Sequence, residues 1–187
     1  MRKHTKILAL TVVLAAAGWF AGCNGTVDKE PNVVLEVATM LIPPVTATTT
    51  GGVCTFTIVA ASATFNNKPK NSLSGTSIFP YNDVVLNNVE IDYTWDDDLP
   101  PPAGTPTELD GQVFGIAGTV PAGGSSAATF SVANGAVLSL PMADFLGVGG
   151  HTARLQMTFH GTTVGGDPVT STTGGTLTVN SCPPAAP

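Results

Sequence analysis

Charged side chains are scarce in this chain of 187 residues, and basic ones are the scarcest. Lysine, arginine, aspartate and glutamate together make up 11% of the sequence, roughly half the share in an average soluble protein. Beyond the first six residues, the few lysines and arginines form no cluster. Because nucleic-acid affinity rests on neutralising phosphates, this composition argues against binding to DNA or RNA.

Long helical patterns are also missing. Glycine, proline and threonine are abundant in place of charged residues, which disfavours helical bundles and coiled coils. Hydrophobic residues still account for 43%, so the composition is not that of a disordered chain. The length suits one domain with a sizeable core.

The residue patterns of common catalytic sites are absent as well. There is no Gly-x-Ser-x-Gly elbow, no His-Glu-x-x-His motif and no Walker-type loop, and the cysteine spacing does not match a zinc site. His151 and His160 bracket one predicted strand at opposite parity, so we expect them on opposite faces, as surface or loop residues. We therefore predict no catalytic residue, no metal ligand and no cofactor, and a protein that is not an enzyme.

The N-terminus has the layout of an export signal. Residues 1–6 (MRKHTK) are basic, and residues 7–17 form an apolar stretch of eleven residues, shorter than the ~20 that span a bilayer. Phe20, Ala21 and Gly22 then precede Cys23. This arrangement resembles the lipobox of bacterial lipoproteins, where signal peptidase II cleaves, although the family usually has an aliphatic residue at the position of Phe20.

The lipobox resemblance implies that residues 1–22 are removed and that Cys23 is lipidated on its sulfur and acylated, for example with palmitate, on its new amino group. Several acyl chains on one residue give a stable attachment that a single chain does not. The alternative is an ordinary signal cut after an alanine, with Cys23 incidental. In enteric members of the family an aspartate after the cysteine retains the protein in the inner membrane, so Asn24 favours the outer membrane. The face of the membrane stays open.

Cleavage before Cys23 would leave residues 23–187. Three of the seven basic residues would leave with the signal, so four would face thirteen acidic ones, for a net charge of −9. We interpret residues 23–32 as a polar tether, residues 33–182 as a single domain and residues 183–187 as a Pro/Ala-rich tail.

Alternation of apolar and polar residues dominates the body of the chain and indicates strands with one buried and one solvent-exposed face. The clearest run covers residues 89–95, where Val89, Ile91, Tyr93 and Trp95 share one parity. One-sided burial is typical of antiparallel sheets. Further strands are predicted over residues 33–40, 54–60 (with Phe56, Ile58 and Ala60 inward), 112–120, 128–133, 136–140, 153–160 and 176–180.

Segments rich in glycine, proline and asparagine separate these runs, and Asn134-Gly135 is a strong hairpin signal between two of them. A single helical turn is predicted at residues 141–146. About eight short strands with turns between them favour a two-sheet sandwich. The predicted turns cover residues 66–71, 99–106, 121–126 and 165–168.

The last third of the chain resembles the end of bacterial immunoglobulin-like and fibronectin-like domains. Glycines lead into an alternating strand at residues 151–160, and a tight loop leads on to a final strand that contains Leu177 and Val179. A histidine and a threonine stand where antibody-type domains carry a corner tyrosine. The resemblance implies an all-β fold, an antiparallel immunoglobulin-like two-sheet β-sandwich of about seven to nine strands.

The two remaining cysteines test this topology. Cys54 opens an early strand and Cys182 closes the last one, and an immunoglobulin-like order places these two strand ends side by side. In an exported chain, such a pair is expected to form a disulfide bond. The alternative is two free thiols.

Two further features could serve ligand binding. Asp96, Asp97 and Asp98 form an acidic cluster of the kind Ca²⁺ prefers, but their spacing fits no EF-hand-type ladder, and a solvated turn is the simpler interpretation. Phe79-Pro80-Tyr81 is a candidate exposed aromatic patch for glycans, whereas the aromatic residues of the run at 89–95 are expected in the core.

The sequence thus predicts a lipid-anchored protein of the bacterial cell envelope that presents a β-sandwich for structural or adhesive protein–protein contacts. Its expected partners are the membrane, through Cys23, and an envelope protein. The alternative is a ligand-binding module for glycans or Ca²⁺-dependent surfaces. A hydrolase is the third and least favoured class.

Overall fold

The computed structural model describes residues 32–50, 53–58, 60–70, 80–95, 108–139 and 150–182. The chain divides into two compact units, Met1–Glu30 and Pro31–Pro187, and every described residue belongs to the second unit. No helix within the described ranges is long and apolar enough to cross a bilayer. The elements are β1 (Val33–Leu41), β2 (Thr46–Thr50), β3 (Val53–Thr57), β4 (Ala61–Pro69), the 3-10 helix η1 (Pro80–Asn82), β5 (Val84–Trp95), β6 (Glu108–Val120), β7 (Ser125–Phe130), α2 (Gly135–Ser139), β8 (His151–Thr163) and β9 (Pro168–Val179).

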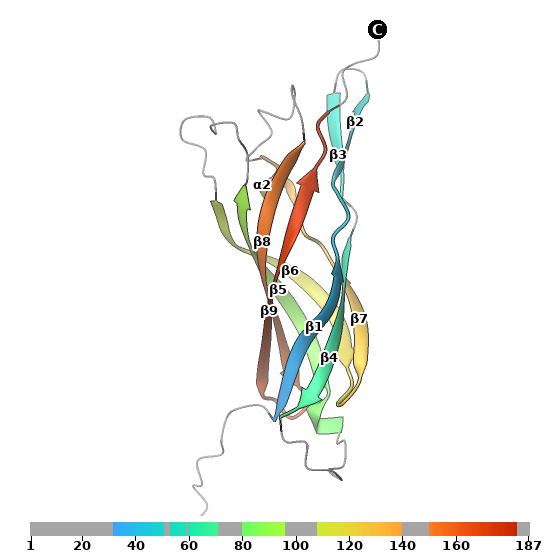
Figure 1. Cartoon of the computed structure of the whole chain (residues 1–187), viewed down its shortest axis with the longest axis vertical. Coiled ribbons are helices and arrows are strands. Elements are labelled where there is room, and N and C mark those ends of the chain that lie inside the picture. Colours follow the sequence, from blue (N-terminus) through green and yellow to red (C-terminus); the bar gives the residue numbers. More distant parts are fainter. Residues whose placement is uncertain are drawn as a thin grey trace, which may run out of the picture. The chain divides into compact units, whose positions relative to one another are not determined.

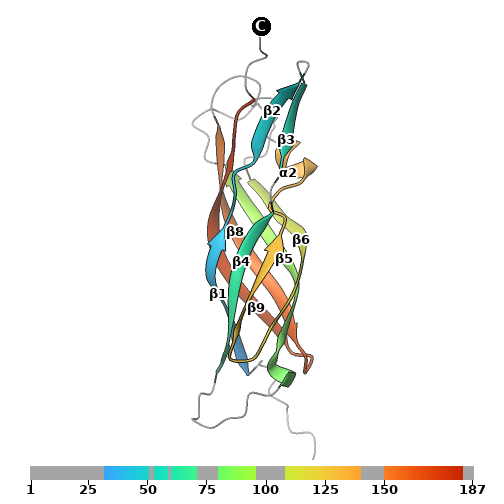
Figure 2. The same cartoon turned by 90° about the vertical axis from the view of Figure 1, so that its right-hand side faces the viewer.

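Seven strands are hydrogen-bonded in the order β1-β4-β7-β6-β5-β8-β9, and β2 and β3 form a separate hairpin. β6 and β7 share a single residue pair, Ile116 with Phe130, so the strands separate there into a β1-β4-β7 layer and a β6-β5-β8-β9 layer (Figures 1 and 2). Within each layer the strands pair antiparallel. The predicted fold class is confirmed: the unit is an all-β, immunoglobulin-like sandwich.

Aromatic side chains join the two layers. Phe65 on β4 and Phe130 on β7 both pack edge-to-face on Phe159 of β8, with ring centroids 4.9 and 5.2 Å apart. All three side chains are buried. The alternation predicted for residues 153–160 is what directs Phe159 inward, because successive side chains of a strand point to opposite faces.

A β-bulge explains why only the second half of β5 shows a regular alternation of apolar and polar residues in the sequence. The register of β5 against both neighbours shifts between Leu86 and Asn88. Leu86 is buried before the shift and Val89 after it, so the inward parity changes from even to odd. The strand therefore begins at Val84, five residues before the predicted start.

The predicted turn at residues 66–71 is wrong over residues 66–69, because β4 continues to Pro69. Asn67 occupies an inward position and is buried. Its side-chain amide donates to the backbone carbonyls of Asn82, at 2.7 Å, and Val120, at 3.2 Å. A buried amide with these partners is compatible with a strand, whereas asparagine-rich sequence by itself indicates a turn.

The strand predicted at residues 136–140 is also wrong, since residues Gly135–Ser139 form the short helix α2. Asn134 caps it: the side-chain Oδ1 accepts from the Val137 backbone N–H at 3.0 Å. Asparagine before glycine suits both a hairpin turn and a helix N-cap, and the cap is the outcome here. The helical turn predicted at residues 141–146 and the turn at 99–106 lie outside the described residues.

The strand predicted at 54–60 is shorter and less buried than expected. β3 pairs with β2 in the separate hairpin, which lies between β1 and β4 in the chain. Cys54 and Phe56 are half-buried, while Ile58 and Ala60 are exposed. Alternation identified the strand, but it could not show that the strand lies outside the two main layers.

The sandwich has two distinct ends (Figures 1 and 2). The hairpin end contains β2, β3 and Cys182. The entry end contains the start of β1, the last residues of β4, η1 and the β8–β9 turn. Hydrogen bonds connect these segments: Lys70 N–H donates to the Asn32 carbonyl at 2.8 Å, and Gly165 N–H donates to the Tyr81 carbonyl at 2.9 Å.

Candidate functional site

The outer face of β5, β8 and β9 is a continuous polar surface. Each of these strands directs alternate side chains outward, and the strand register aligns them in rows across the sheet. The rows are Glu90, Thr158 and Thr172; then Asp92, Gln156 and Gly174; and then Thr94, Arg154 and Thr176.

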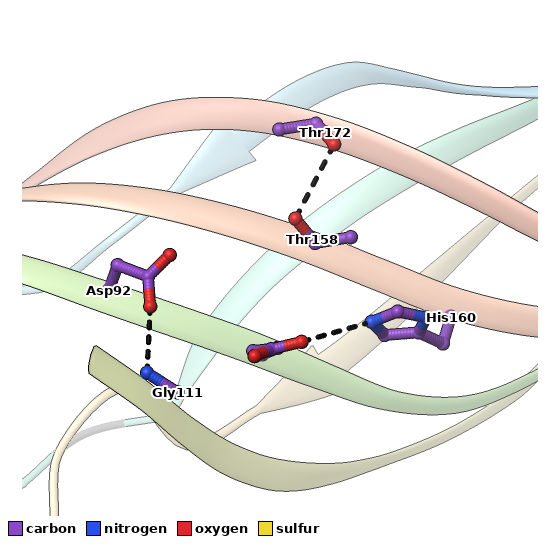
Figure 3. Close-up of polar contacts among 6 residues, drawn as sticks. Asp92, Gly111, Thr158, His160 and Thr172 are labelled. Carbon is purple, nitrogen blue, oxygen red and sulfur yellow. Dashed lines mark hydrogen bonds and ion pairs between the residues drawn. The ribbon is translucent and has the colours of Figure 1, made fainter.

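Short-range contacts order this face (Figure 3). Glu90 Oε2 lies 3.5 Å from His160 Nε2, and the hydroxyls of Thr158 and Thr172 are 3.4 Å apart. Asp92 Oδ1 accepts a 2.7 Å hydrogen bond from the backbone N–H of Gly111, which has a φ of 66°. That left-handed conformation favours glycine, so the β6 backbone fixes one oxygen of Asp92.

A shallow groove of about 470 Å³ crosses the outer face. Gly174 has no side chain, so it leaves a gap between Thr172 and Thr176 on β9. The side chains around that gap provide hydroxyl, amide, carboxylate and guanidinium groups. Those lining the groove with Gly174 include Asp92, Thr94, Arg154, Gln156 and Thr172.

This set of groups suits recognition by hydrogen bonds. Threonine hydroxyls and the Gln156 amide both donate and accept, while Asp92 accepts and Arg154 donates. Hydroxyl-rich ligands such as sugars present complementary donors and acceptors. The groove thus has the chemistry of a weak polar binding site on a rigid sheet.

The two histidines point to opposite faces, as predicted. His160 is half-exposed on the polar face, but His151 is buried, with 3% of its surface exposed. The prediction that both lie at the surface is therefore wrong for His151. Its position shares the inward parity of Ala153 and Leu155, which explains the burial.

Tyr93 belongs to the core, as predicted. Burial raises the pKa of its hydroxyl well above the usual value, because the phenolate would lose its hydration. The protonated hydroxyl donates to the Val132 carbonyl at 2.9 Å. Trp95 is half-buried and packs against the core. Tyr93 therefore has a structural role, and neither residue provides an exposed aromatic platform.

Cys54 and Cys182 are joined by the expected disulfide bond, with their Cα atoms 5.9 Å apart. Cys54 lies in β3 and Cys182 follows β9, so the bond ties the hairpin to the last strand of the sandwich. Cys23, the predicted lipidation site, lies outside the described residues.

The predicted acidic cluster at Asp96, Asp97 and Asp98 and the aromatic Phe79 also lie outside the described residues. Within the described ranges, no three His, Cys, Asp or Glu side chains are grouped as metal ligands. Tyr81 is 69% exposed, as expected for part of a surface aromatic patch.

The groove residues were not singled out from the sequence. Residues 170–178 contain a threonine at every second position except Gly174, a pattern that marks one polar strand face with a gap. That signal places Thr172 and Gly174 on one face. It does not pair them with Arg154 or Asp92, because cross-strand register depends on the fold.

No protein-family model matches the chain, and no curated protein sequence matches it. Among solved structures, a late embryogenesis abundant (LEA) protein is 15% identical and covers 96% of this chain and 87% of its own, with a TM-score of 0.39. AggA, the major subunit of aggregative adherence fimbriae type I from Escherichia coli, is 13% identical and covers 81% and 95%, with a TM-score of 0.27. Similarity this distant says nothing about function.

Proposed function

We propose that this protein is a lipid-anchored, non-enzymatic component of the bacterial cell envelope that presents a β-sandwich for structural or adhesive contacts with other proteins. In this proposal the acyl chains on Cys23 hold the protein at the membrane. Because Asn24 rather than aspartate follows the cysteine, we propose that this membrane is the outer membrane. The sandwich is the rigid body that partners contact.

The pairing of the cysteines supports this proposal most directly. The sequence has three cysteines, and two of them are used in the Cys54–Cys182 disulfide. Disulfides are typical of exported proteins. The third, Cys23, stands directly after an apolar segment and two small residues, where a lipoprotein requires its modified cysteine. An odd cysteine in an exported protein calls for an explanation, and lipidation supplies one.

Replacing Cys23 tests the anchor. In a Cys23→Ser variant expressed with its own signal, we expect the protein to move from the membrane fraction to the soluble fraction, because the acylated residue is lost. Mass spectrometry of the N-terminal peptide should show the acyl chains in the parent protein and none in the variant.

Cys54→Ser is the matched control, since it removes a cysteine without touching the predicted anchor. It should remain in the membrane fraction. Retention of the Cys23→Ser variant in that fraction would count against lipid attachment.

The groove on the outer face favours a second candidate function, glycan binding. Its hydroxyl, amide and charged groups match the hydrogen-bonding capacity of sugars. A glycan array probed with the protein tests this candidate, and a uniformly negative array would remove its support.

If the groove binds a glycan, filling it should weaken binding at least tenfold. A Cβ added at Gly174 meets one atom, the Leu155 carbonyl oxygen, at an ordinary contact distance of 3.7 Å. Gly174→Val should therefore fill the groove and leave the fold intact. Gly115→Val is the control, because a Cβ there meets nothing within 4 Å. Equal array signals from the two variants would place binding elsewhere.

A further inference from the structure

Three exposed apolar side chains lie close together at the entry end of the sandwich. Tyr81 on η1 is 69% exposed, Val164 in the β8–β9 turn 55% and Val85 on β5 40%. They are neighbours: Gly165 N–H donates to the Tyr81 carbonyl, and Val85 pairs with Thr162, two residues before Val164. We call Tyr81, Val85 and Val164 the entry patch.

The backbone that carries the entry patch is fixed at several points. Val164 N–H donates to the Asp83 carbonyl at 2.8 Å, and the Asn67 amide donates to the Asn82 carbonyl at 2.7 Å. The Asp83 carboxylate in turn accepts from Ala122 N–H at 2.8 Å. An exposed tyrosine on a fixed turn loses little conformational freedom on binding, which favours its use as an anchor.

Among the described residues, charge is nearly balanced at this end, although the chain from Cys23 onward carries a net −9. Lys68, which forms an ion pair with Glu36, and Lys70 lie here. Among the described residues, Asp83 and Asp167 are the other carboxylates of this end. Two lysines against three carboxylates make this end less repelled by anionic lipid than the chain as a whole.

The entry end is also the end from which the chain leads to Cys23. β1 begins at Val33, ten residues after Cys23, and ten residues reach at most ~35 Å when fully extended. β8 has 13 residues, so at ~3.3 Å per residue the sandwich extends roughly 43 Å from the entry end toward the hairpin end. A membrane that holds Cys23 can thus meet the entry end much more readily than the hairpin end.

We propose that the entry patch is a docking surface for the phospholipid membrane. This inference rests on the lipid anchor of the proposed function and adds an orientation to it. Tyrosine has an apolar ring and a polar hydroxyl, a combination enriched at membrane interfaces. The short tether keeps the patch at an effective concentration near the surface in the millimolar range, so a weak contact is sufficient. In this orientation the hairpin end points away from the bilayer.

Tryptophan quenching by brominated lipid tests the proposal on the full chain in vesicles of phosphatidylethanolamine and phosphatidylglycerol. Tyr81→Trp places a probe in the patch. Val53→Trp is the matched control, at a 62% exposed position in the hairpin. The parent chain provides the background of native tryptophan. We expect at least threefold more quenching at position 81 than at position 53.

The outcomes separate this inference from the anchor. If the chain floats with the vesicles but the two probes are quenched equally, the docking surface is overturned and the anchor stands. If the chain does not float with them, both fail. A blue shift at position 81 that persists in detergent and grows with protein concentration would assign the patch to a second copy and overturn the proposal.

A second substitution tests whether the apolar side chains of the entry patch are responsible for the quenching at position 81. Val164→Asp added to Tyr81→Trp should return quenching to the level of the hairpin probe, because a carboxylate opposes insertion into the interface. Val113→Asp, at another exposed valine (62%) on β6, should leave the quenching unchanged. Loss of quenching in both variants would contradict the proposal.

Discussion

Removing the Cys54–Cys182 disulfide should lower the free energy of unfolding by up to about 5 kcal/mol. The bond closes a loop of 128 residues, and the chain-entropy model relates the stabilisation to the logarithm of that length. For a domain of this size, such a loss corresponds to a fall in Tm of roughly 10–20 °C. Thermal unfolding of a Cys54→Ser, Cys182→Ser double variant measures it.

The hairpin offers a non-covalent control. The hydroxyls of Thr48 and Thr55 lie 3.0 Å apart on neighbouring strands of the same hairpin and are exposed. Replacing both with valine should change the free energy of unfolding by about 1 kcal/mol or less. If the cysteine variant melted within ~2 °C of the parent protein, the disulfide would not be a main source of stability.

Phe159→Ala should destabilise the fold by about 3–5 kcal/mol. Phe159 is fully buried and contacts aromatic rings from two strands of the opposite layer, Phe65 and Phe130. Its removal leaves a cavity between the two layers, which the remaining rings can fill only in part. Urea unfolding with an unchanged m-value would attribute the loss to the folded state.

Two further variants serve as references for the size of this destabilisation. Phe159→Leu should cost less than the alanine variant, because leucine fills part of the cavity. Val113→Ala, at an exposed position on β6, should change stability by about 0.5 kcal/mol or less. An alanine variant at position 159 as stable as the one at position 113 would contradict the described packing of the two layers.

The fold class could be predicted from the sequence because burial is one-sided along most strands. Residues 89–95 and 153–160 alternate cleanly, and both lie within strands that are buried on one face. The disulfide followed from the same topology. Its prediction succeeded although Cys54 lies in the inserted hairpin rather than in a strand of the two layers, because that hairpin lies at the end where β9 finishes.

The errors have local physical causes. Asparagine stabilises turns, helix caps and buried carbonyl pairs with the same amide group. Asn134 forms a helix cap instead of a hairpin turn. The Asn67 side-chain amide donates to two backbone carbonyls from distant parts of the chain, which makes its buried position in a strand possible. The β5 bulge hid the start of that strand, since one extra residue inverts the parity.

The candidate site was less predictable than the fold, because each strand supplies only part of it. Asp92, Gln156 and Gly174 come from three strands and meet through register alone. The entry patch is similar: Tyr81 was identified as a surface aromatic residue, but Val164 lies far along the chain. Exposed valines carry no pattern that marks them as neighbours of Tyr81.

The position of the disulfide also affects how the protein withstands proteases. The chain from residue 54 to residue 182 forms one covalent ring that includes every strand from β4 to β9. Residues 71–79, 96–107 and 140–149, which lie outside the described residues, also fall inside that ring. One peptide-bond cleavage in any of them opens the ring but releases no fragment, so the nicked molecule stays in one piece until its disulfide is reduced.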